Sequence, residues 1–526
     1  MSDLILIRKN SYFDSVLLMR LSRELKSLGG IDDAVVAMGT PQNRALLSDA
    51  GYNNSELESA SPNDLVIAVR GESLECARIE QAIAELLKAD RKAADSEDRP
   101  RSLAAALHIA PGASLALISV PGQYAAREAR AALSRGLHVM LFSDNVSIDD
   151  EAALKREAIA RGLLMMGPDC GTAIINGKPL AFANVVRRGA IGIVGASGTG
   201  IQEATCRIHH LGGGISQAIG TGGRDLSDQM GGLMTLAGID ALADDPATRI
   251  IVVISKPPSL SVAAKVIEAL QRAGKQAVIH FVGDKPRRTR EQSGTPHVTF
   301  ADSLADAGTK ACQLLGLPPC APAGQEISPE LISTLVARLS PGAQLRGLFC
   351  GGTTGQEAVA ILDREGIEVF SNLHKSGPLH IDGTDPVSGN VVLDLGADEF
   401  TVGRPHPMID PLIRNERLAD EAANPNAGLL LFDCMLGYGS HPDPAGVLAD
   451  GVLASRGTAA RRGGSIVAIA SITGTPEDPQ DFHKQKRKIE DAGVFVVTSN
   501  CQAARLAAEV LRAAANRQSA RQRNQQ

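Results

Sequence analysis

Short runs of consecutive apolar residues alternate along the chain with longer segments in which apolar residues recur every three to four positions. The runs include LVIAV from Leu65, IGIVG from Ile191, IIVVIS from Ile250 and SIVAIAS from Ser465. Continuous apolar runs of this length are typical of strands buried on both faces of a parallel sheet. The periodic segments, such as AAKVIEALQRAG from Ala263, end in Gly and are typical of helices. The alternation predicts an α/β fold of several doubly wound parallel-sheet domains, Rossmann-like or flavodoxin-like.

Length and polar interruptions divide this pattern into domains. The 526 residues are too many for a single hydrophobic core. Polar segments at 88–102 and 317–330 are expected to be linkers, and a further boundary is expected near Val185, just before a glycine-rich loop. We therefore predict five parts, the last of them a disordered tail: 1–102, 103–188, 189–318, 328–515 and 516–526.

Composition limits the partners. The chain has 44% apolar and 21% charged residues, a net charge of −6, only 3% aromatic residues and no Trp. These values argue against nucleic-acid or membrane-surface binding and favour small-molecule substrates. The apolar N-terminal stretch is too short for a secretory signal and no long uncharged apolar run occurs, so a cytoplasmic protein is expected. The eight cysteines have no C-x-x-C pair and no zinc-spaced His. They are predicted to be reduced core thiols, without a metal.

Two glycine-rich stretches mark an internal repeat. GAIGIVGASGTGIQEAT begins at Gly189 and LRGLFCGGTTGQEAV begins at Leu345. After each loop come a strand with a Gly-rich acidic turn, a loop containing Arg, a helix, a DDP or ANP turn, and another apolar strand. Residues 189–318 and about 343–515 are therefore predicted to be two related doubly wound domains.

Each glycine loop follows a buried strand and opens a helix. Backbone N–H groups at such a helix start favour an anion, so phosphate or carboxylate binding is predicted. The predicted phosphate-binding residues are Ser197, Gly198, Thr199, Gly351, Gly352, Thr353 and Thr354. The alternative is that the hydroxyls only cap helices and the glycines only make turns. Glu203 and Glu357, in the shared QEA, would be either first-turn partners of the helix dipole or groups that orient a ligand.

The residues from Ala116 through MMGPDCGTAI, followed by IGIVGASGTGIQEA, resemble the α chain of succinyl-CoA synthetase, and the second half resembles the ligase domain of its β chain. The N-terminal KNSYFDSVLLMRLSRELKSLGG, with SPNDLVIAVR and TVGRPHPMIDP, resembles the FdrA family, single-chain relatives of those synthetases. The resemblance implies a succinyl-CoA synthetase-like fold in which two helices point at one phosphate from opposite sides. The two loops are then expected to face each other across a domain interface, with Glu203 and Glu357 flanking the cleft.

The chain also departs from the synthetase pattern. AVIHFVGDKPRRTREQSG contains no GHAG-type phosphohistidine loop, and His280 within it is expected to be a core residue. The G-x-T-G-x-Q-G loop that helps hold CoA and a separate nucleotide-grasp domain are also missing. No cofactor is expected. The FdrA resemblance implies a subunit of an oxamate carbamoyltransferase, which interconverts oxamate and carbamoyl phosphate with oxalurate and phosphate in allantoin and purine nitrogen catabolism.

Charged residues near the loops could serve this chemistry. Arg224 and Arg404 occupy corresponding places in the two repeats and could hold phosphate or a substrate carboxylate; each could instead be a structural salt-bridge partner. His406 is a candidate carbonyl polariser or proton shuttle, oriented by Asp410, or simply a loop residue between two prolines.

Two further residues follow corresponding strands. Lys256 and His441 lie where open α/β sheets bind ligands, and both are candidates for substrate binding or simply solvated. Cys170 has no base nearby in the sequence and is not expected to be a nucleophile.

Three functions remain open. The first is a carbamoyltransferase subunit that uses carbamoyl phosphate and oxamate and works with partner subunits. The second is a nucleotide-dependent, succinate-CoA ligase-like acyl-CoA synthetase whose nucleotide-handling part lies on another chain. The third is a non-catalytic scaffold of a multi-enzyme complex.

Overall fold

The computed structural model describes residues 2–523 except 10, 12, 14, 27, 41–42, 45–46, 49, 53–54, 73, 75, 95–99, 284–296, 319–326, 383–387 and 402–403. The chain divides into two compact units, Met1–Ile109 with Phe400–Pro405, and Ala110–Glu399 with His406–Gln526. In the part of the chain described, no helix combines the length and apolar character needed to cross a membrane.

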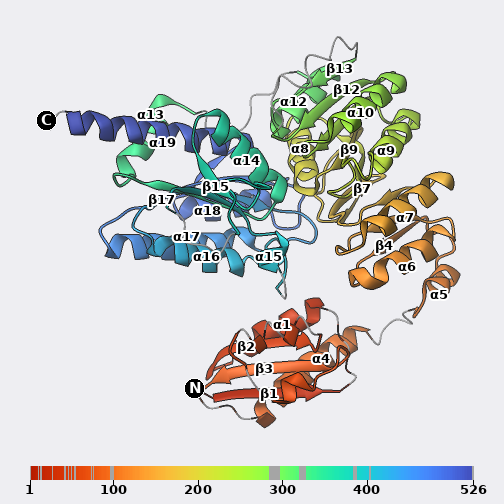
Figure 1. Cartoon of the computed structure of the whole chain (residues 1–526), viewed down its shortest axis with the longest axis horizontal. Helices are drawn as coiled ribbons and strands as arrows, with labels where there is room; N and C mark the ends of the chain where they lie inside the picture. Colours follow the sequence, from red (N-terminus) through yellow and green to blue (C-terminus); the bar gives the residue numbers. More distant parts are fainter. Residues whose placement is uncertain are drawn as a thin grey trace. The chain divides into compact units, whose positions relative to one another are not determined.

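The first unit is built on a three-stranded sheet with the order β1-β3-β2, drawn in red and orange in Figure 1. All its pairings are antiparallel, unlike the parallel sheets that the apolar runs predict. Leu21, Leu25, Leu65 and Ile67 are fully buried between the sheet and its helices. The elements are β1 (Ser2–Arg8), α1 (Ser15–Lys26), β2 (Ile31–Met38), α3 (Ser55–Glu58), β3 (Leu65–Gly71), α4 (Cys76–Ala94) and α5 (Leu103–Ile109).

The second unit begins with a small parallel sheet in the order β4-β5-β6. The helix after β5 begins at a conventional cap, because the side chain of Ser147 accepts a hydrogen bond from the backbone N–H of Asp150. The elements are β4 (Leu115–Ile118), α6 (Gly122–Leu133), β5 (His138–Leu141), α7 (Ile148–Ala160) and β6 (Met165–Met166).

Two larger sheets follow, and five adjacent strands have the same order in both. The strands β13-β12-β11-β9-β10 of the first sheet correspond to β19-β18-β17-β14-β16 of the second. The seven-stranded sheet has the order β13-β12-β11-β9-β10-β7-β8, and the six-stranded sheet has the order β15-β16-β14-β17-β18-β19. The shared strands are parallel, and β7 and β8 add an antiparallel hairpin at one edge. This agreement confirms the predicted repeat of two doubly wound domains. The strands are β7 (Thr172–Ile175), β8 (Lys178–Ala181), β9 (Arg188–Ala196), β10 (Ile215–Gly220), β11 (Ile250–Ser255), β12 (Gln276–Phe281), β13 (Val298–Phe300), β14 (Gln344–Phe349), β15 (Val369–Ser371), β16 (Asn390–Asp394), β17 (Ala427–Met435), β18 (Val467–Thr473) and β19 (Phe495–Val497).

Helices cover both faces of each large sheet (Figure 1). In the first loop domain (β9 to α12), α8 and α12 pack together on one face and α9 and α10 on the other. In the second loop domain (α13 to α19), α13, α14 and α19 lie on one face and α16 and α17 on the other. The helices are α8 (Gly198–His210), α9 (Leu233–Asp244), α10 (Leu260–Ala273), α12 (Leu304–Leu314), α13 (Pro329–Arg338), α14 (Gly352–Arg364), α15 (Asp398–Thr401), α16 (Leu412–Ala423), α17 (Pro444–Arg461), α18 (Phe482–Asp491) and α19 (Asn500–Arg523).

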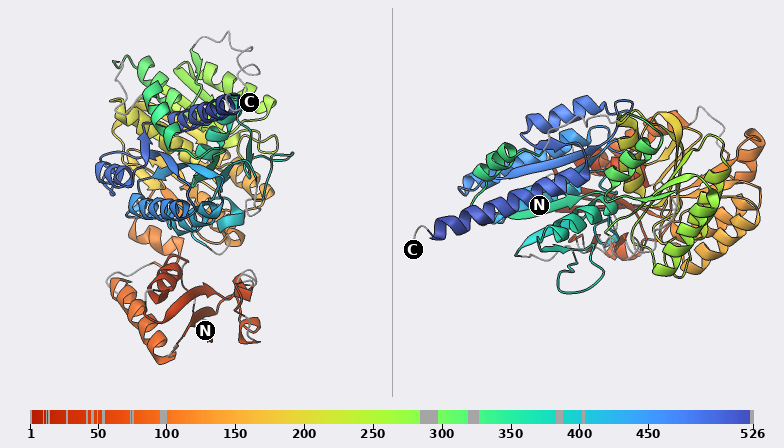
Figure 2. Two further views of the ribbon diagram at one scale, coloured as in Figure 1. Left: turned by 90° about the vertical axis from the view of Figure 1, so that its left-hand side faces the viewer. Right: turned by 90° about the horizontal axis from the view of Figure 1, so that it is seen from above.

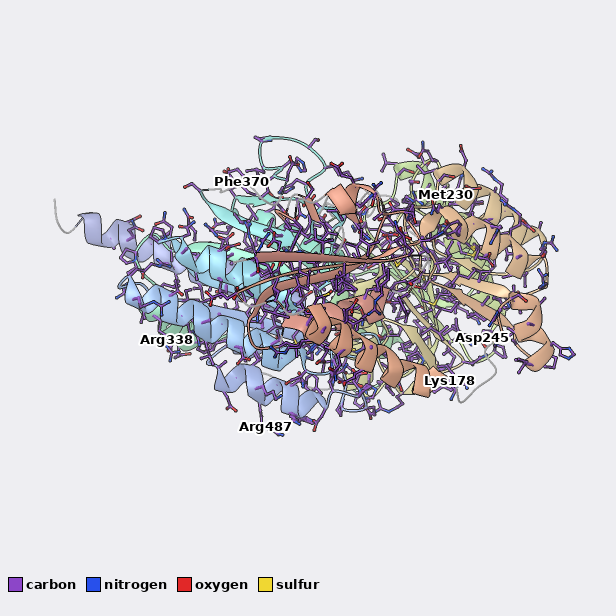
Figure 3. All side chains as sticks on the ribbon, turned by 90° about the horizontal axis from the view of Figure 1, so that it is seen from below. Lys178, Met230, Asp245, Arg338, Phe370 and Arg487 are labelled. Atoms are coloured by element: carbon purple, nitrogen blue, oxygen red, sulfur yellow. The ribbon has the colours of Figure 1, made fainter. Side chains whose placement is uncertain are left out.

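The repeat extends to individual turns. Asp245, labelled in Figure 3, follows α9, and its side chain accepts a hydrogen bond from the N–H of Ala247 at 3.0 Å. Asn424 follows α16, and its side chain accepts from the N–H of Asn426 at 2.9 Å. The DDP and ANP segments therefore form the same Asx turn at the same place in both domains.

The C-terminal segment is helical where the sequence predicted a disordered tail. Helix α19 continues past residue 515 to Arg523 and is the long dark-blue helix in the right panel of Figure 2. Six of the eight residues 516–523 are Arg, Gln or Ala, and these residues have high helix propensity, which outweighs the polarity of the segment.

A buried ion network ties α7 to the first loop domain. The Lys155 side chain is fully buried, and its Nζ donates to Glu151 Oε1 at 2.7 Å, Asp225 Oδ1 at 2.8 Å and the carbonyl of Thr221 at 2.9 Å. Asp225 also accepts from the N–H groups of Met234 and Thr235, at the start of α9. Lys155 therefore neutralises two carboxylates that have no access to water.

We expect Lys155→Met to lower the free energy of unfolding by about 3–5 kcal/mol, because it leaves the buried carboxylate of Asp225 without its cation and removes one of the two cations that pair with Glu151. Urea unfolding followed by circular dichroism measures the loss. Lys484→Met, at an exposed position on α18, is the control and should change stability by less than about 0.5 kcal/mol. A loss of the same small size in Lys155→Met would show that the network contributes little.

Candidate functional site

The two glycine loops meet at the interface between the loop domains. Ser197 caps α8 by accepting from the N–H of Gly200, and its Oγ donates to Thr353 Oγ1 at 2.9 Å. A β-carbon on Gly351 would lie 2.5 Å from Cγ2 of Thr199, so only glycine allows the loops to approach this closely. The prediction that the loops face each other is confirmed.

The two helix starts differ in how they are capped. Ser197 supplies a side-chain cap to α8, whereas α14 begins after Gly351, which has no side chain to offer. Thr354 does not replace the missing cap, because its single hydroxyl proton is shared between the carbonyl of Gly351 and Oδ2 of Asp433. Helix α14 therefore keeps its first N–H groups without a side-chain cap.

Each loop helix carries a glutamate that caps a helix of the other domain. Glu203, on α8, accepts from the N–H of Asn500 at 3.2 Å, at the start of α19, and from Thr473 Oγ1 at 2.6 Å. Glu357, on α14, accepts from the N–H of Leu304 at 2.7 Å, at the start of α12, and from Asn500 Nδ2 at 2.8 Å. The two carboxylates thus cross the interface in opposite directions and satisfy otherwise unpaired helix N–H groups.

The prediction that these glutamates flank an open cleft is wrong. Glu203 is 5% exposed and Glu357 is 3% exposed. Burial raises the pKa of Glu203, and it raises the pKa of Glu357 to about 7, against the opposing effect of their hydrogen bonds. Both side chains are therefore interface residues rather than groups that can contact a substrate.

Two charged side chains reach the start of α14. A β-carbon on Gly352 would lie 2.5 Å from Asp394 Oδ2 and 3.6 Å from Lys256 Nζ. Asp394 ends β16 of the second loop domain, whereas Lys256 directly follows β11 of the first. Lys256 is exposed and has no ion pair within 4 Å among the described residues. The predicted substrate-binding lysine thus lies beside the uncapped helix start.

His406 lies on the other side of Asp394. A β-carbon on Gly396 would lie 2.6 Å from His406 Nε2 and 3.2 Å from Asp394 Oδ1. Nδ1 of His406 accepts from the N–H of Met408, so the neutral ring carries its proton on Nε2. Burial lowers the pKa of His406 to about 4, which keeps the ring neutral at pH 7. The ring is therefore a potential neutral hydrogen-bond donor next to Asp394.

The acidic residues of this site were not among the predicted ones. Burial raises the pKa of Asp394 to about 6, and Lys256 opposes the rise. Asp169, in the GPDCG turn, has an exposed surface, but the surrounding protein and Asp144 raise its pKa to about 6, again opposed by Lys256. The only sequence signal for either residue is its place directly after an apolar strand, at the carboxyl edge where ligands bind.

The structure assigns other contacts to several predicted catalytic residues. Arg224 pairs with Glu151 at 2.8 Å and donates to the carbonyl of Val146, so it belongs to the Lys155 network. Arg404 lies in the segment Phe400–Pro405, which groups with the first unit.

Two neighbouring loop residues have local roles. Asp410 Oδ1 accepts from the N–H of Leu412 at the start of α16 and does not orient His406. The N–H of His441 donates to the carbonyl of Met408, the residue whose N–H is bonded to His406. His441 therefore supports the loop that carries His406.

Other sequence expectations are resolved in the core. His280 is buried, its Nδ1 lies 3.0 Å from the carbonyl of Ala301, and burial lowers its pKa to about 4, as suits a core residue. The described cysteines are free and buried except Cys76, which is exposed; Cys320 lies outside the described residues. Cys76 escapes burial because it sits at the first residue of α4, on its exposed side.

The raised pKa of Glu357 generates a pH prediction. A carboxyl group with a pKa near 7 when folded and near 4.5 when unfolded stabilises the fold below pH 4.5 and loses that contribution as the pH rises through 7. Glu357→Gln, a neutral mimic of the protonated acid, should therefore be more stable than the wild type above pH 8, by roughly 3 kcal/mol. The difference should vanish near pH 4.5. Thermal melts at pH 4.5, 6, 7 and 8.5 test this, and a difference that did not change with pH would contradict it.

Comparison with known proteins finds three families of related domains. The chain matches the families described as "AllF, heavy metal-associated domain" over residues 1–102, "CoA binding domain" over 186–283 and "CoA-ligase" over 348–510. The name of the first family does not imply a metal here, because residues 1–102 contain one Cys and no His. Within the described residues, no group of three or more His, Cys, Asp or Glu side chains could hold a metal ion.

Individual relatives include a protein similar over nearly the whole chain and a subunit of a CoA ligase. The chain is 43% identical over 514 residues to "Uncharacterized protein YahF" of Escherichia coli, covering 97% of this chain and 99% of that one. It is 30% identical to the succinate–CoA ligase [ADP-forming] subunit alpha of Aquifex aeolicus, over 28% of this chain and 48% of that subunit. A dinucleotide-forming acetyl-coenzyme A synthetase of Ca. Korarchaeum cryptofilum matches 77% of this chain and 84% of its own, at 16% identity and a TM-score of 0.31, which is too low to support an argument. The chain is similar to YahF over nearly its full length, and it matches the AllF-type, CoA-binding and CoA-ligase families. It therefore belongs to the YahF family of FdrA/AllF-like, succinyl-CoA synthetase-like proteins.

Proposed function

We propose that this chain is a subunit of an enzyme that moves an acyl group between phosphate and a second acceptor, and that the phosphate is held where the glycine loops meet. The observation that carries the proposal is the Ser197–Thr353 hydrogen bond, which brings the starts of α8 and α14 together. Helix starts attract anions through unpaired N–H groups and the helix dipole. Lys256 adds a positive charge beside Gly352.

The domain content favours chemistry of the acyl-CoA ligase type. The chain shares its CoA-binding and CoA-ligase families with such enzymes, and a succinate–CoA ligase α subunit is among its relatives. In this proposal an acyl phosphate is cleaved by a thiol such as that of CoA. The part that handles the nucleotide is supplied by a partner subunit, since the sequence contains no separate grasp domain.

The residues at the start of α14 suit an acyl phosphate. Lys256 and the first N–H groups of α14 would hold the phosphate oxygens, and Nε2–H of the neutral His406 would donate to the acyl carbonyl oxygen. Such fixed donors stabilise the negative charge that develops as the carbonyl is attacked. Holding phosphate and acceptor together supplies much of the remaining acceleration.

Carbamoyl transfer is a second candidate, favoured by one observation. No His occurs in residues 282–296, after the strand where succinyl-CoA synthetases carry their phosphohistidine loop. A chain without that residue can still use an acyl phosphate formed elsewhere, and carbamoyl phosphate is one. The reaction would convert oxamate and carbamoyl phosphate into oxalurate and phosphate, with the same phosphate subsite and with partner subunits.

Lys256→Met is expected to slow acyl transfer about ten- to a hundredfold, because it removes a charge-assisted contact to phosphate worth about 1.5–3 kcal/mol. Release of inorganic phosphate measures the rate, from acetyl or succinyl phosphate with CoA and from carbamoyl phosphate with oxamate. Each pair is assayed with the chain alone and with the products of the neighbouring genes. The pair that supports turnover identifies the acceptor.

Lys265→Met is the matched control, since Lys265 is exposed on α10 and the substitution changes the net charge equally. Its rate should equal that of the wild type. Equal rates in both variants would show that phosphate is not held at Lys256. No turnover with either pair, under all combinations of partners, would favour the scaffold hypothesis.

A further inference from the structure

We propose that Asp394 makes the phosphate subsite at the start of α14 selective for a protonated oxyanion, so that it binds hydrogen phosphate and rejects sulfate. The inference rests on the phosphate subsite of the proposed function and names the residue that selects inorganic phosphate there. An acyl phosphate carries no proton near neutral pH, so the selectivity applies to the inorganic phosphate that acyl transfer releases or consumes.

Asp394 is buried, and the surrounding structure fixes its orientation. Its side chain is 9% exposed, and Oδ1 accepts from the N–H of Gly396 at 3.0 Å. The Asn372 side chain holds the backbone of Asp394 from both sides: Oδ1 accepts from its N–H and Nδ2 donates to its carbonyl, each at 3.0 Å. Rotating the carboxylate away would therefore break its bond to Gly396, and the backbone that carries it is fixed by Asn372.

The second oxygen of Asp394 is free to accept. Oδ2 has no hydrogen-bond donor among the described residues and points at the start of α14, within 2.5 Å of where a β-carbon on Gly352 would lie. An unpaired acceptor and the Lys256 ammonium group thus both lie close to Gly352, the first residue of α14, whose N–H groups have no side-chain cap.

This combination of groups accepts some anions and rejects others. The helix N–H groups and Lys256 donate to the oxygens of any oxyanion. An ionised carboxylate can only accept, and it repels an oxygen that carries no proton. Phosphate retains a proton near neutral pH and can donate it to Oδ2, whereas sulfate has none to donate. Discrimination then comes from the repulsion of the wrong ligand as much as from attraction of the right one.

The first loop lacks this device. By strand register, Asp394 pairs with Phe349 just before the second loop, and Gly220 pairs with Gly195 at the corresponding place before the first. A side chain at Gly220 would collide with the carbonyl of Thr172, so no carboxylate can occupy that position. The start of α8 also carries its own cap in Ser197. The selective subsite therefore belongs to the second loop alone.

Calorimetric titration of the full-length chain with inorganic phosphate and with sulfate, at pH 7.5 and constant ionic strength, tests the inference. At this pH Asp394, with a pKa of about 6, is ionised. The wild type should bind phosphate at least about tenfold more tightly than sulfate. Phosphate gains one charge-assisted hydrogen bond to Asp394, whereas sulfate is repelled by it. In Asp394→Asn the amide can donate to either anion, so the preference should fall to less than about threefold.

Asp240→Asn is the control, because Asp240 lies on the surface of α9, pairs only with Arg272 and carries the same charge. It should keep the wild-type preference. The inference is overturned if the wild type binds sulfate as tightly as phosphate, if it binds neither anion, or if Asp394→Asn keeps the preference. The wild-type comparison decides the matter even if Asp394→Asn does not fold. Phosphate selectivity without acyl transfer would leave this inference standing and remove the proposed function; transfer without selectivity would do the reverse.

Discussion

The crossed pair of buried glutamates is the constraint on which the second unit depends. Glu203 and Glu357 each leave their own domain and accept N–H groups at a helix start in the other. Separating the domains would break these bonds and expose both the N–H groups and the carboxylates to water. Asn500 takes part in both contacts, since its N–H donates to Glu203 and its side chain donates to Glu357. The two contacts therefore form one cooperative polar network, and its integrity keeps Ser197 within hydrogen-bond distance of Thr353.

The two loop domains share a fold but not a chemistry. Their strand order and even the Asx turns at Asp245 and Asn424 agree. They differ at a few positions around the loops, where Ser197 corresponds to Gly351 and Gly220 to Asp394 by strand register. Repetition of the fold places two helix starts opposite each other, and these local differences make one start capped and the other available. The functional asymmetry thus arises without any change in architecture.

Much of the fold, and part of the site, could be predicted from the sequence. Apolar runs reflect burial on both faces of a strand, so they indicated the parallel sheets and the repeat. The antiparallel N-terminal sheet has the same kind of run at Leu65, because β3 is also covered on both faces, and the run therefore did not reveal the strand direction. Residue roles were harder, because they depend on partners far away in sequence. Arg224 is paired with Glu151, and Glu203 is paired with Asn500. No pattern in the neighbouring sequence predicts either pair. A single Asp after a strand, such as Asp394, gives no signal of its burial.

The helices of the loops separate two tasks along their length. The domain contacts are made by Glu203 and Glu357, which lie at the same sequence distance beyond their caps, Ser197 and Gly351. Had the domains been joined through the N–H groups of the loops themselves, those donors would have been consumed by the interface. Because the glutamates join the domains from deeper in each helix, the start of α14 stays free to meet Lys256 and Asp394. Rigid attachment and unpaired donors, which an anion site needs together, are thus provided by different turns of the same helix.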